Sequence, residues 1–264
     1  QWVYQTVVGK DPRQYQFPFA LWTRNAIGSL IYKRYGIRLS ANSVGRLLAQ
    51  LGITAQKPLW KAYQQDPERV RKWVQEDYPA IEKEAKQMKA EIWFADESGL
   101  RSDYHAGTTW GVKGQTPVVR STGARYRLNM ISAVNRRGRM RFMIEKKGVN
   151  ADVICRFLDR LMVGSKAPVF LIWDGHPMHK SGKVRETVES YEGKLRLYLL
   201  PGYSPELNPG EGVWREVKSH RLGRAGIFSF AEMKSMALWA LRSLLKRPDI
   251  IRGFFHTPST LYAS

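Results

Sequence analysis

The segment Pro168-Val169-Phe170-Leu171-Ile172-Trp173-Asp174-Gly175 decides the fold. An unbroken run of β-branched and aromatic residues, opened by proline and closed by glycine, is typical of a strand covered on both faces of a sheet. Asp174 then stands at the carboxyl end of this strand, where open α/β sheets place their ligands. An Asp before a Gly is also a common turn former, so the functional interpretation of Asp174 depends on acidic residues elsewhere.

Two other acidic residues occupy positions that can reach the same region. Asp96 ends a second short apolar run, Ile92-Trp93-Phe94-Ala95, and Glu211 opens a helical pattern after a loop rich in proline and glycine. Three carboxylates from separate elements can converge on hard cations that take oxygen ligands, and Mg²⁺ or Mn²⁺ are the expected ions. The sequence therefore predicts a metal site made of Asp96, Asp174 and Glu211.

The composition of the 264 residues, 43% hydrophobic and 12% aromatic, predicts one large domain and a smaller one. No apolar run approaches the length of a membrane span and no signal peptide opens the chain, so we expect no membrane partner. The single Cys155 excludes an internal disulfide and a thiolate zinc site, and it fits a reducing compartment such as the cytoplasm. Because the chain begins at Gln1 without Met, we interpret it as processed or truncated, with an upstream element missing.

The net charge of +20, with a pI near 10.2, predicts a polyanionic partner. Nucleic acid is favoured over a membrane surface, because no basic amphipathic helix with a broad apolar face is present. The excess is most one-sided in residues 1–57, where eight Lys and Arg residues face a single acidic residue, Asp11.

This basic amino-terminal part has a helix-turn-helix pattern. Apolar residues recur at helical spacing over residues 18–35 and again over 41–50, with the turn Gly36-Ile37-Arg38-Leu39 between them. A small helical bundle with a solvated basic face is the alternative, and the local charge favours DNA binding. Residues 53–63 are interpreted as a wing strand that ends in a linker. The residues expected to contact DNA here are Asn42, Ser43, Arg46, Arg38 and Lys57.

The remainder of the chain predicts an α/β fold with a mixed sheet flanked by helices. A helix over residues 66–88, interrupted at Pro79, is interpreted as a linker. Strands are expected at 92–96, 108–112, 127–134, 139–144, 169–173 and 195–200, and helices at 151–162, 180–191, 208–218 and, closing the domain, 231–245. The predicted domains are thus 1–57, 58–90 and 91–264.

Three motifs carry a resemblance to a known family. They are Phe94-Ala95-Asp96-Glu97-Ser98, the segment Ile172–His176 with His179-Lys180-Ser181, and Leu199-Leu200-Pro201-Gly202-Tyr203-Ser204-Pro205-Glu206-Leu207-Asn208-Pro209-Gly210-Glu211-Gly212-Val213-Trp214. Over residues 91–220 the chain resembles the mariner-like DDE transposases of bacterial insertion sequences, in the insertion-sequence 630 group. Residues 18–57 resemble the second, winged helix-turn-helix half of that family's DNA-binding region, and the first half would lie upstream of Gln1.

The resemblance implies an RNase H-like catalytic domain and a DDE triad at Asp96, Asp174 and Glu211. It also implies two Mg²⁺ (or Mn²⁺) ions, cleavage at transposon ends and strand transfer into target DNA, in the cut-and-paste manner. The implied partners are double-stranded DNA, as terminal inverted repeats and as target, and a second copy of the chain on that DNA, at the bacterial nucleoid. Two departures from the family are Gly210, where a larger residue is common, and Gly175 in place of Asn, which makes a metal contact from residue 175 doubtful.

Several neighbouring polar residues have a structural and a functional interpretation. His176 and His179 are interpreted as loop histidines that touch phosphate or solvent rather than as zinc ligands, because no third ligand is near in sequence. Strand alternation turns Glu97 away from Asp96, and Glu206 lies in a loop. Tyr203 is interpreted as packing over the loop and not as a nucleophile. Four basic residues have two interpretations, as contacts to DNA phosphates or as solvated surface residues: Arg136, Arg137, Lys218 and Arg221.

Two other functions use part of the same pattern. A hydrolytic nuclease or resolvase would share the triad without needing a site-specific amino-terminal module, and a non-enzymatic DNA-binding regulator would need only residues 1–57. Glu211 also stands at capping-box spacing from Asn208, so helix capping is an alternative role for that carboxylate.

DNA binding is expected to be dominated by phosphate contacts, since the basic residues supply the counter-charge. The logarithm of the affinity should fall with the logarithm of salt concentration, with a slope of about −0.9 for each phosphate neutralised. A fluorescence anisotropy titration at increasing NaCl measures this slope, and an affinity that does not change with salt would contradict a nucleic-acid partner.

Overall fold

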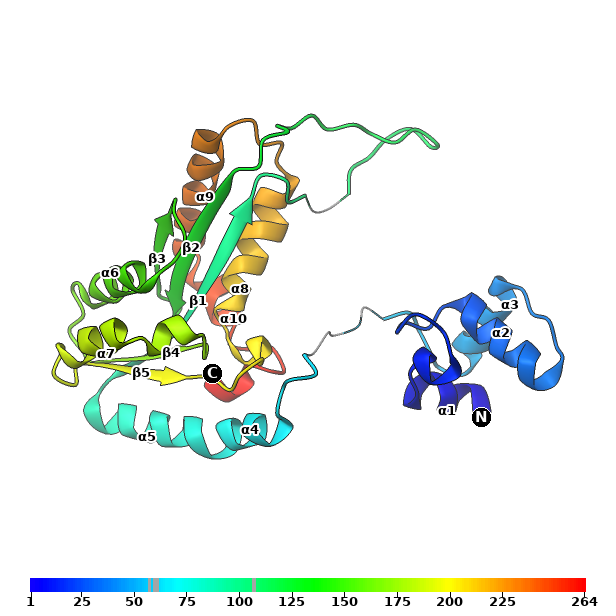
Figure 1. Ribbon diagram of the computed structural model, residues 1–264, viewed down its shortest axis with the longest axis horizontal. Coiled ribbons are helices and arrows are strands. Elements are labelled where there is room, and N and C mark those ends of the chain that lie inside the picture. Colours follow the sequence, from blue (N-terminus) through cyan, green and yellow to red (C-terminus); the bar gives the residue numbers. More distant parts are fainter. Residues whose placement is uncertain (57, 59–61, 106–107) are drawn as a thin grey trace. The chain divides into compact units, whose positions relative to one another are not determined.

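The computed structural model describes residues 1–56, 58, 62–105 and 108–264, with the backbone alone described at His220. The chain divides into two compact units, Gln1–Trp60 and Lys61–Ser264 (Figure 1). Each unit has a hydrophobic core of its own.

The first unit is a small helical domain with helices α1 (Trp2–Gly9), α2 (Arg24–Tyr35) and α3 (Ala41–Gln50). Ile27, Ile31 and Val44 form its buried centre, and apolar residues of α1 pack against them. Helix α1 was not predicted. Helix α2 begins at Arg24 and not near residue 18, because the Thr23 side chain caps it by accepting the N–H of Ala26.

The turn between α2 and α3 follows the sequence prediction. Gly36 ends α2 in the left-handed conformation, at a φ of 69°, and the Ser40 hydroxyl caps α3 by accepting the N–H of Ser43. The expected wing strand does not form in residues 53–56, which have no strand geometry, and most of the remaining stretch up to residue 61 lies outside the described residues.

The second unit is built on a five-stranded sheet in the order β3-β2-β1-β4-β5. The strands are β1 (Glu91–Arg101), β2 (Arg127–Val134), β3 (Met140–Glu145), β4 (Val169–Trp173) and β5 (Leu195–Leu199). The pairs β1/β2 and β2/β3 are antiparallel, whereas β1/β4 and β4/β5 are parallel. The mixed sheet predicted from the sequence is therefore confirmed.

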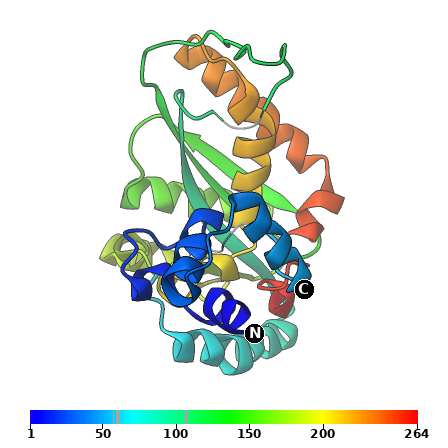
Figure 2. The same ribbon diagram turned by 90° about the vertical axis from the view of Figure 1, so that its right-hand side faces the viewer.

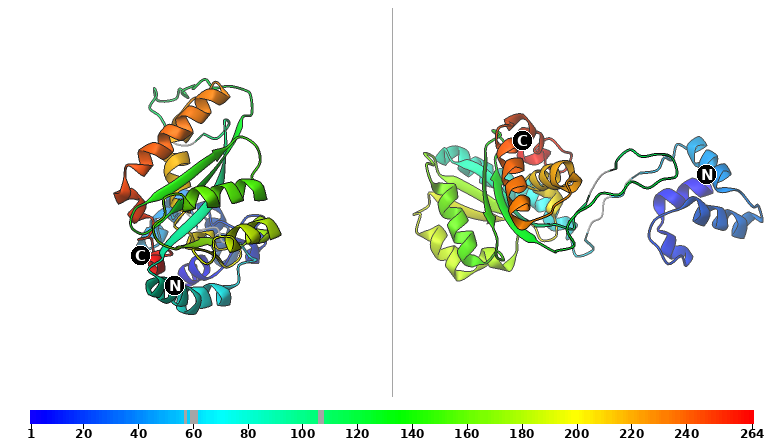
Figure 3. Two further views of the ribbon diagram at one scale, coloured as in Figure 1. Left: turned by 90° about the vertical axis from the view of Figure 1, so that its left-hand side faces the viewer. Right: turned by 90° about the horizontal axis from the view of Figure 1, so that it is seen from above.

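Helices cover both faces of this sheet (Figures 2 and 3). Helices α6 (Ala151–Met162) and α7 (Gly182–Glu189) pack on one face, against residues such as Trp93 and Trp173. The other face, which contains Phe94, is covered by α4 (Pro67–Lys72), α5 (Tyr78–Met88), α8 (Glu211–Trp214), α9 (Phe230–Leu245) and α10 (Pro248–Gly253). Alternate residues of β1 thus enter different cores, as the period of a strand requires.

One predicted strand is absent. Residues 108–112 have no strand geometry, and the Trp110 side chain is 98% exposed. The reason is that β1 continues to Arg101, which pairs directly with Arg127 of β2. The described residues of the connection between these two, 102–105 and 108–126, therefore lie outside the sheet. Ser102 closes the base of this connection, because its hydroxyl donates to the Ala124 carbonyl at 2.6 Å.

The segment interpreted as a linker helix belongs to the second core. Its regular hydrogen bonding is broken by a π-helical turn, Trp73–Asp77, just before Pro79, whose ring nitrogen has no hydrogen to donate. Tyr78 and Ile81 are buried against the same core as Phe94. The domain also continues past the helix expected to close it, because α10 and Phe255 add to this core.

Ile81→Ala is expected to lower the stability of the second unit by about 2–5 kcal/mol, since it leaves a cavity beneath β1. Lys83→Ala, two residues along the same helix and exposed, should change it by less than about 0.5 kcal/mol. Urea unfolding measures both values. Equal effects of the two changes would mean that this helix is a linker outside the core.

Candidate active site

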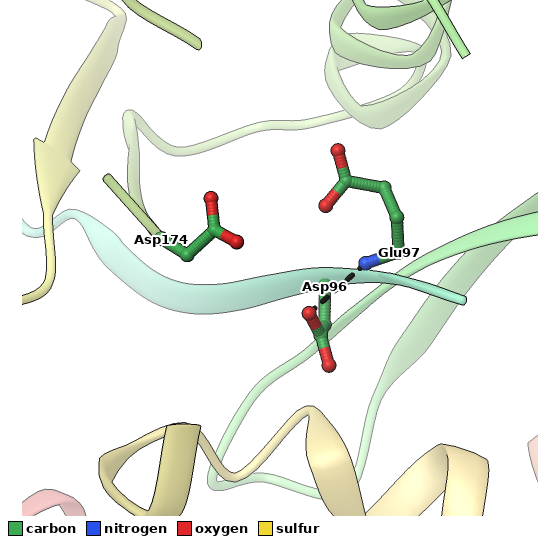
Figure 4. A group of neighbouring side chains, drawn as sticks. All are labelled: Asp96, Glu97 and Asp174. Atoms are coloured by element: carbon green, nitrogen blue, oxygen red, sulfur yellow. Dashed lines mark hydrogen bonds between the residues drawn. The ribbon is translucent and has the colours of Figure 1, made fainter. Parts of the chain in front are cut away.

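The parallel pairing of β1 with β4 brings two of the predicted acidic residues together. Phe94 is opposite Ile172, so Asp96 and Asp174 lie two residues further along neighbouring strands (Figure 4). Asp96, Glu97 and Asp174 each offer an oxygen atom within 4.8 Å of the others. Asp174 lies just beyond the end of β4, which explains how it can approach residues on both faces of β1.

Asp96 is a buried carboxylate, with 7% of its surface exposed. Its Oδ2 accepts a hydrogen bond from Trp214 Nε1 at 2.8 Å, and its Oδ1 accepts the N–H of Glu97 at 3.0 Å. Burial raises the pKa of Asp96 well above its usual value, and the neighbouring charges of Glu211 and Glu97 raise it further. A carboxylate in this setting favours a bound proton or a bound cation.

Glu211 lines the same cavity as Asp96 and Asp174, a space of about 500 Å³. The segment before it is fixed to β1, because Asn208 Nδ2 donates to the carbonyl of Ala95 at 2.9 Å. Partial burial raises the pKa of the Glu211 carboxyl, while Lys218 and Arg215 oppose the shift. The structure therefore brings all three predicted residues to one cavity.

The glycine before Glu211 has a structural explanation. A Cβ atom at Gly210 would lie 2.9 Å from Asn208 Oδ1 and 3.1 Å from the Cβ of Asp96. Asn208 Oδ1 also accepts the N–H of Gly210 at 2.9 Å. The departure from the family pattern at position 210 therefore lets the loop approach β1 closely.

Helix capping does not account for Glu211. A capping box would need the Glu211 side chain to accept the backbone N–H of Asn208, but that N–H donates to the carbonyl of Pro205 at 2.9 Å. The helix begins at Glu211 itself, with Gly210 at the cap position. The Glu211 carboxylate is thus left to face the cavity.

The buried side chain of His179 contacts both Asp174 and Glu97. The imidazole is 2% exposed, with Nδ1 2.7 Å from Asp174 Oδ1 and Nε2 2.7 Å from Glu97 Oε1. Its ring stacks on Trp173 at 4.3 Å between centroids. The interpretation of His179 as a loop residue touching phosphate or solvent is therefore wrong. The chain turns back after β4 and buries the imidazole against Trp173 and Glu97. His176, by contrast, is exposed.

The charges of this group are mutually dependent. Burial would lower the pKa of His179, but its hydrogen bonds to Asp174 and Glu97 raise that pKa to about 10. Burial would raise the pKa of Asp174, but the hydrogen bonds from His179 and from the backbone N–H of His176 lower it. At neutral pH an imidazolium therefore lies between two carboxylates.

Glu97 points to the face opposite Asp96, which confirms the prediction from strand alternation (Figure 4). Its two oxygens accept hydrogen bonds from Trp173 Nε1 and His179 Nε2, each at 2.7 Å. Sequence reasoning missed this supporting role. This role depends on the register of β1 against β4, which no local sequence pattern predicts.

The basic residues predicted near the site have different surroundings. Lys218, in a π-helical stretch after α8, is half-buried; burial lowers its pKa, and the nearby carboxylates of Glu211 and Asp96 oppose the shift. Arg221 lies 3.2 Å from Glu216 and donates to the Ser243 hydroxyl at 2.8 Å.

Two further predicted arginines lie at the hairpin between β2 and β3. Arg136 pairs with Glu82 at 2.7 Å, and Arg137 pairs with Glu91 at 3.0 Å. Glu91 is the first residue of β1, so these arginines lie near the start of that strand. Asp96 lies further along the same strand.

In the amino-terminal unit the predicted DNA-contacting residues gather on α3 and the turn before it. Asn42 and Arg46 are exposed, and the Ser43 hydroxyl lies 3.0 Å from that of Ser40. The Arg38 guanidinium lies over the Tyr32 ring at 4.8 Å. Lys57 falls outside the described residues.

The donor set of the cavity fits a hard divalent cation. Carboxylate oxygens are the preferred ligands of Mg²⁺ and Mn²⁺, and a cation would relieve the repulsion that raises the pKa of Asp96. Glu97 has both oxygens engaged by neutral or cationic donors, so the cavity residues Asp96, Asp174 and Glu211 suit the ion better.

Family comparison matches residues 91–234 to the model described as DDE superfamily endonuclease. The chain belongs to this superfamily. Residues 18–77 match a second model, the winged helix-turn-helix, which agrees with the winged helix-turn-helix domain predicted from the sequence. A comparison with the curated proteins found no match.

Solved structures similar to this chain include three of Mos1. The mariner paired-end complex with Mn has a TM-score of 0.64 at 17% identity, covering 95% of this chain and 75% of that one. The paired-end complex with Mg has a TM-score of 0.61 at 16% identity, covering 96% and 78%. The Strand Transfer Complex has a TM-score of 0.58 at 16% identity, covering 96% and 77%. These likenesses support the RNase H-like fold.

Within the described part of the chain, no helix combines the length and the apolar character needed to cross a membrane.

Mg²⁺ is expected to stabilise the metal-free protein against heat. A concentration 100 times the Kd contributes about 2.7 kcal/mol, which corresponds to roughly 5–10 °C in Tm for a unit of this size. Asp96→Asn should abolish most of this shift. Asp249→Asn, which removes a surface carboxylate paired with Arg247, should leave it unchanged. Differential scanning fluorimetry checks both, and an equal Mg²⁺ shift in the Asp96 variant would contradict the site.

Proposed function

We propose that this chain is a DNA transposase that cleaves DNA at transposon ends and joins the ends into target DNA in the cut-and-paste manner. The observation that carries the proposal is the convergence of Asp96, Asp174 and Glu211 on one cavity. Membership of the DDE endonucleases, a winged helix-turn-helix domain and similarity to paired-end and strand-transfer complexes of Mos1 support it.

Asp96, Asp174 and Glu211 form the catalytic triad in this proposal and hold Mg²⁺ or Mn²⁺. Two such ions, when bound, activate the attacking oxygen and stabilise the leaving oxygen of an in-line displacement at phosphorus. The residues that surround the triad fix its geometry. Trp214 directs Asp96 by its indole N–H, and Asn208 ties the Glu211 segment to β1.

His179 orients Asp174 through the 2.7 Å contact of its Nδ1, and Glu97 holds the other ring nitrogen. This arrangement leaves Asp174 Oδ2 without a protein hydrogen-bond partner among the described residues, and Asp174 lines the cavity. Support of a ligand by a second layer of hydrogen bonds commonly fixes its orientation and basicity.

The amino-terminal unit positions the double-stranded DNA. We place its contacts at Asn42, Ser43 and Arg46 on α3 and at Arg38 in the turn before it, because polar residues of a second helix suit the major groove. We assign a further contact to Lys57. Further phosphate contacts are assigned to the basic residues Arg136, Arg137, Lys218 and Arg221. A division into a DNA-binding domain (1–57), a helical linker segment (58–90) whose helices α4 and α5 pack on the catalytic core, and a catalytic domain (91–264) completes this assignment.

A cut-and-paste reaction needs both ends of the element at once, so we propose that two copies of the chain assemble on terminal inverted repeats. The reaction takes place on chromosomal DNA, which places the protein at the nucleoid in the bacterial cytoplasm. The test is a reaction with a plasmid that carries the DNA flanking the gene and a second plasmid as target. Joined products support a transposase, whereas cleavage without joining contradicts it in favour of a nuclease.

Glu211→Gln is expected to abolish cleavage and joining, because the neutral amide lacks the negative charge needed to hold a divalent cation in this site. The variant should keep DNA binding, and its stability should stay within about 1 kcal/mol of the parent. Gel assays of cleavage in Mg²⁺ and urea unfolding measure these properties.

Glu206→Gln is the matched control, because Glu206 lies five residues earlier and its Oε1 accepts a hydrogen bond from Gln65 instead of lining the cavity. It should cut at near parental rate. Cleavage by the Glu211 variant at the parental rate would remove Glu211 from the triad.

A further inference from the structure

Tyr203 brings an exposed aromatic ring to the edge of the cavity that contains the three carboxylates. The residue is 61% exposed and lines the same space of about 500 Å³ as Asp96, Asp174 and Glu211. Among the described residues, the ring stacks on no other aromatic side chain and its hydroxyl has no hydrogen-bond partner. Packing over the loop therefore does not explain the choice of tyrosine.

The backbone of Tyr203 has a conformation that an aromatic residue rarely adopts. Its φ is 57°, in the left-handed region, whereas the neighbouring Gly202 does not have a positive φ. Left-handed backbone at a residue with a side chain costs about 1–3 kcal/mol and persists where the surrounding structure enforces it. A glycine at position 203 would avoid this strain, so the tyrosine is not there for the stability of the turn.

The surrounding structure fixes the turn firmly. The side-chain amide of Gln65 donates to the Tyr203 carbonyl at 3.3 Å, to the Ser204 hydroxyl at 3.0 Å and to Glu206 Oε1 at 2.6 Å. Ser204 itself is buried. The turn therefore presents the ring of Tyr203 from a fixed backbone, which limits the entropy that a bound ligand would have to remove.

Away from the carboxylates, much of the cavity lining is apolar. Pro177, Leu200, Pro201 and Pro205 contribute to it, and none of the described residues that line the cavity is Lys or Arg. A wall without cations does not suit a phosphate, which basic groups recognise. A flat, uncharged, polarizable group suits it, and in DNA that group is the nucleobase.

We propose that Tyr203 is a stacking platform for a nucleobase adjacent to the scissile phosphate. The inference rests on the proposed function and adds a base-binding subsite to it. A base displaced from the duplex would lie against the ring while its phosphate reaches the divalent-cation site proposed at Asp96, Asp174 and Glu211. Stacking on an aromatic ring is independent of base identity, because every base has a π-face, and it would fix the register of the strand.

The test uses the full chain and short duplexes that carry the mapped cleavage position, with each nearby nucleotide in turn replaced by an abasic one. Four proteins are compared: the parent, Tyr203→Phe, Tyr203→Leu and Tyr203→Gly. Cleavage rates are measured in Mg²⁺, and affinities are measured by anisotropy in Ca²⁺ without turnover. Thermal unfolding of all four proteins reports on the fold.

For the parent and Tyr203→Phe, one abasic position should reduce affinity in Ca²⁺ and cleavage by about 5- to 100-fold, the range for loss of one stacked base. Tyr203→Gly and Tyr203→Leu should show a comparable loss on intact DNA and no further loss at that abasic position. Tyr203→Gly should be at least as stable as the parent, since it relieves the left-handed strain.

Cleavage and affinity of Tyr203→Gly equal to those of the parent, or an abasic effect that persists in this variant, would overturn the stacking site and leave the proposed function standing. Failure of the parent to cut any duplex in the same reactions would instead overturn the proposed function.

Discussion

The buried charge of Asp96 is the constraint on which the second unit depends. A carboxylate in the core is costly unless hydrogen-bond donors or a cation compensate it. Two donors are built into the fold, the indole N–H of Trp214 and the backbone N–H of Glu97, yet burial and the charge of Glu211 still raise the pKa of Asp96. The remaining demand for positive charge explains why this cavity suits a divalent cation.

The hydrogen bonds that stabilise the buried Asp96 carboxylate also link distant parts of the chain. Trp214 belongs to the short helix that carries Glu211, so its bond to Asp96 and the bond from Asn208 to Ala95 fix that helix to β1. Helix and strand meet closely because Gly210 has no side chain to keep them apart. On the opposite face of the sheet, Glu97 and His179 hold Asp174 by a separate set of hydrogen bonds. Asp96 and Asp174 are thereby oriented by hydrogen bonds from different elements, and the segment that carries Glu211 is held against β1. Rigid support of this kind is what a metal site requires.

The sequence was sufficient for features that local patterns determine. The apolar run before Asp174 predicted β4, and strand alternation correctly placed Glu97 opposite Asp96. Features that depend on pairing between distant segments were missed. The stretch 108–112 is not a strand, because β2 already occupies the edge of β1, and His179 is buried because the turn after β4 returns it to Glu97. The hydrophobic periodicity of the sequence also did not predict the π-helical turn at Trp73–Asp77, although Pro79 indicated an interruption of the helix near it.

Anomalous scattering from Mn²⁺ in crystals of the protein tests the central claim most directly, because it locates the ion rather than its effect. The account predicts density in the cavity with oxygen atoms of Asp96 and Asp174 at about 2.1 Å, and with Glu211 facing the same ion or a second one. Asp96→Asn crystals should lose this density. Mn²⁺ bound between Glu97 and His179, or no ordered ion at the cavity at millimolar Mn²⁺, would contradict the account.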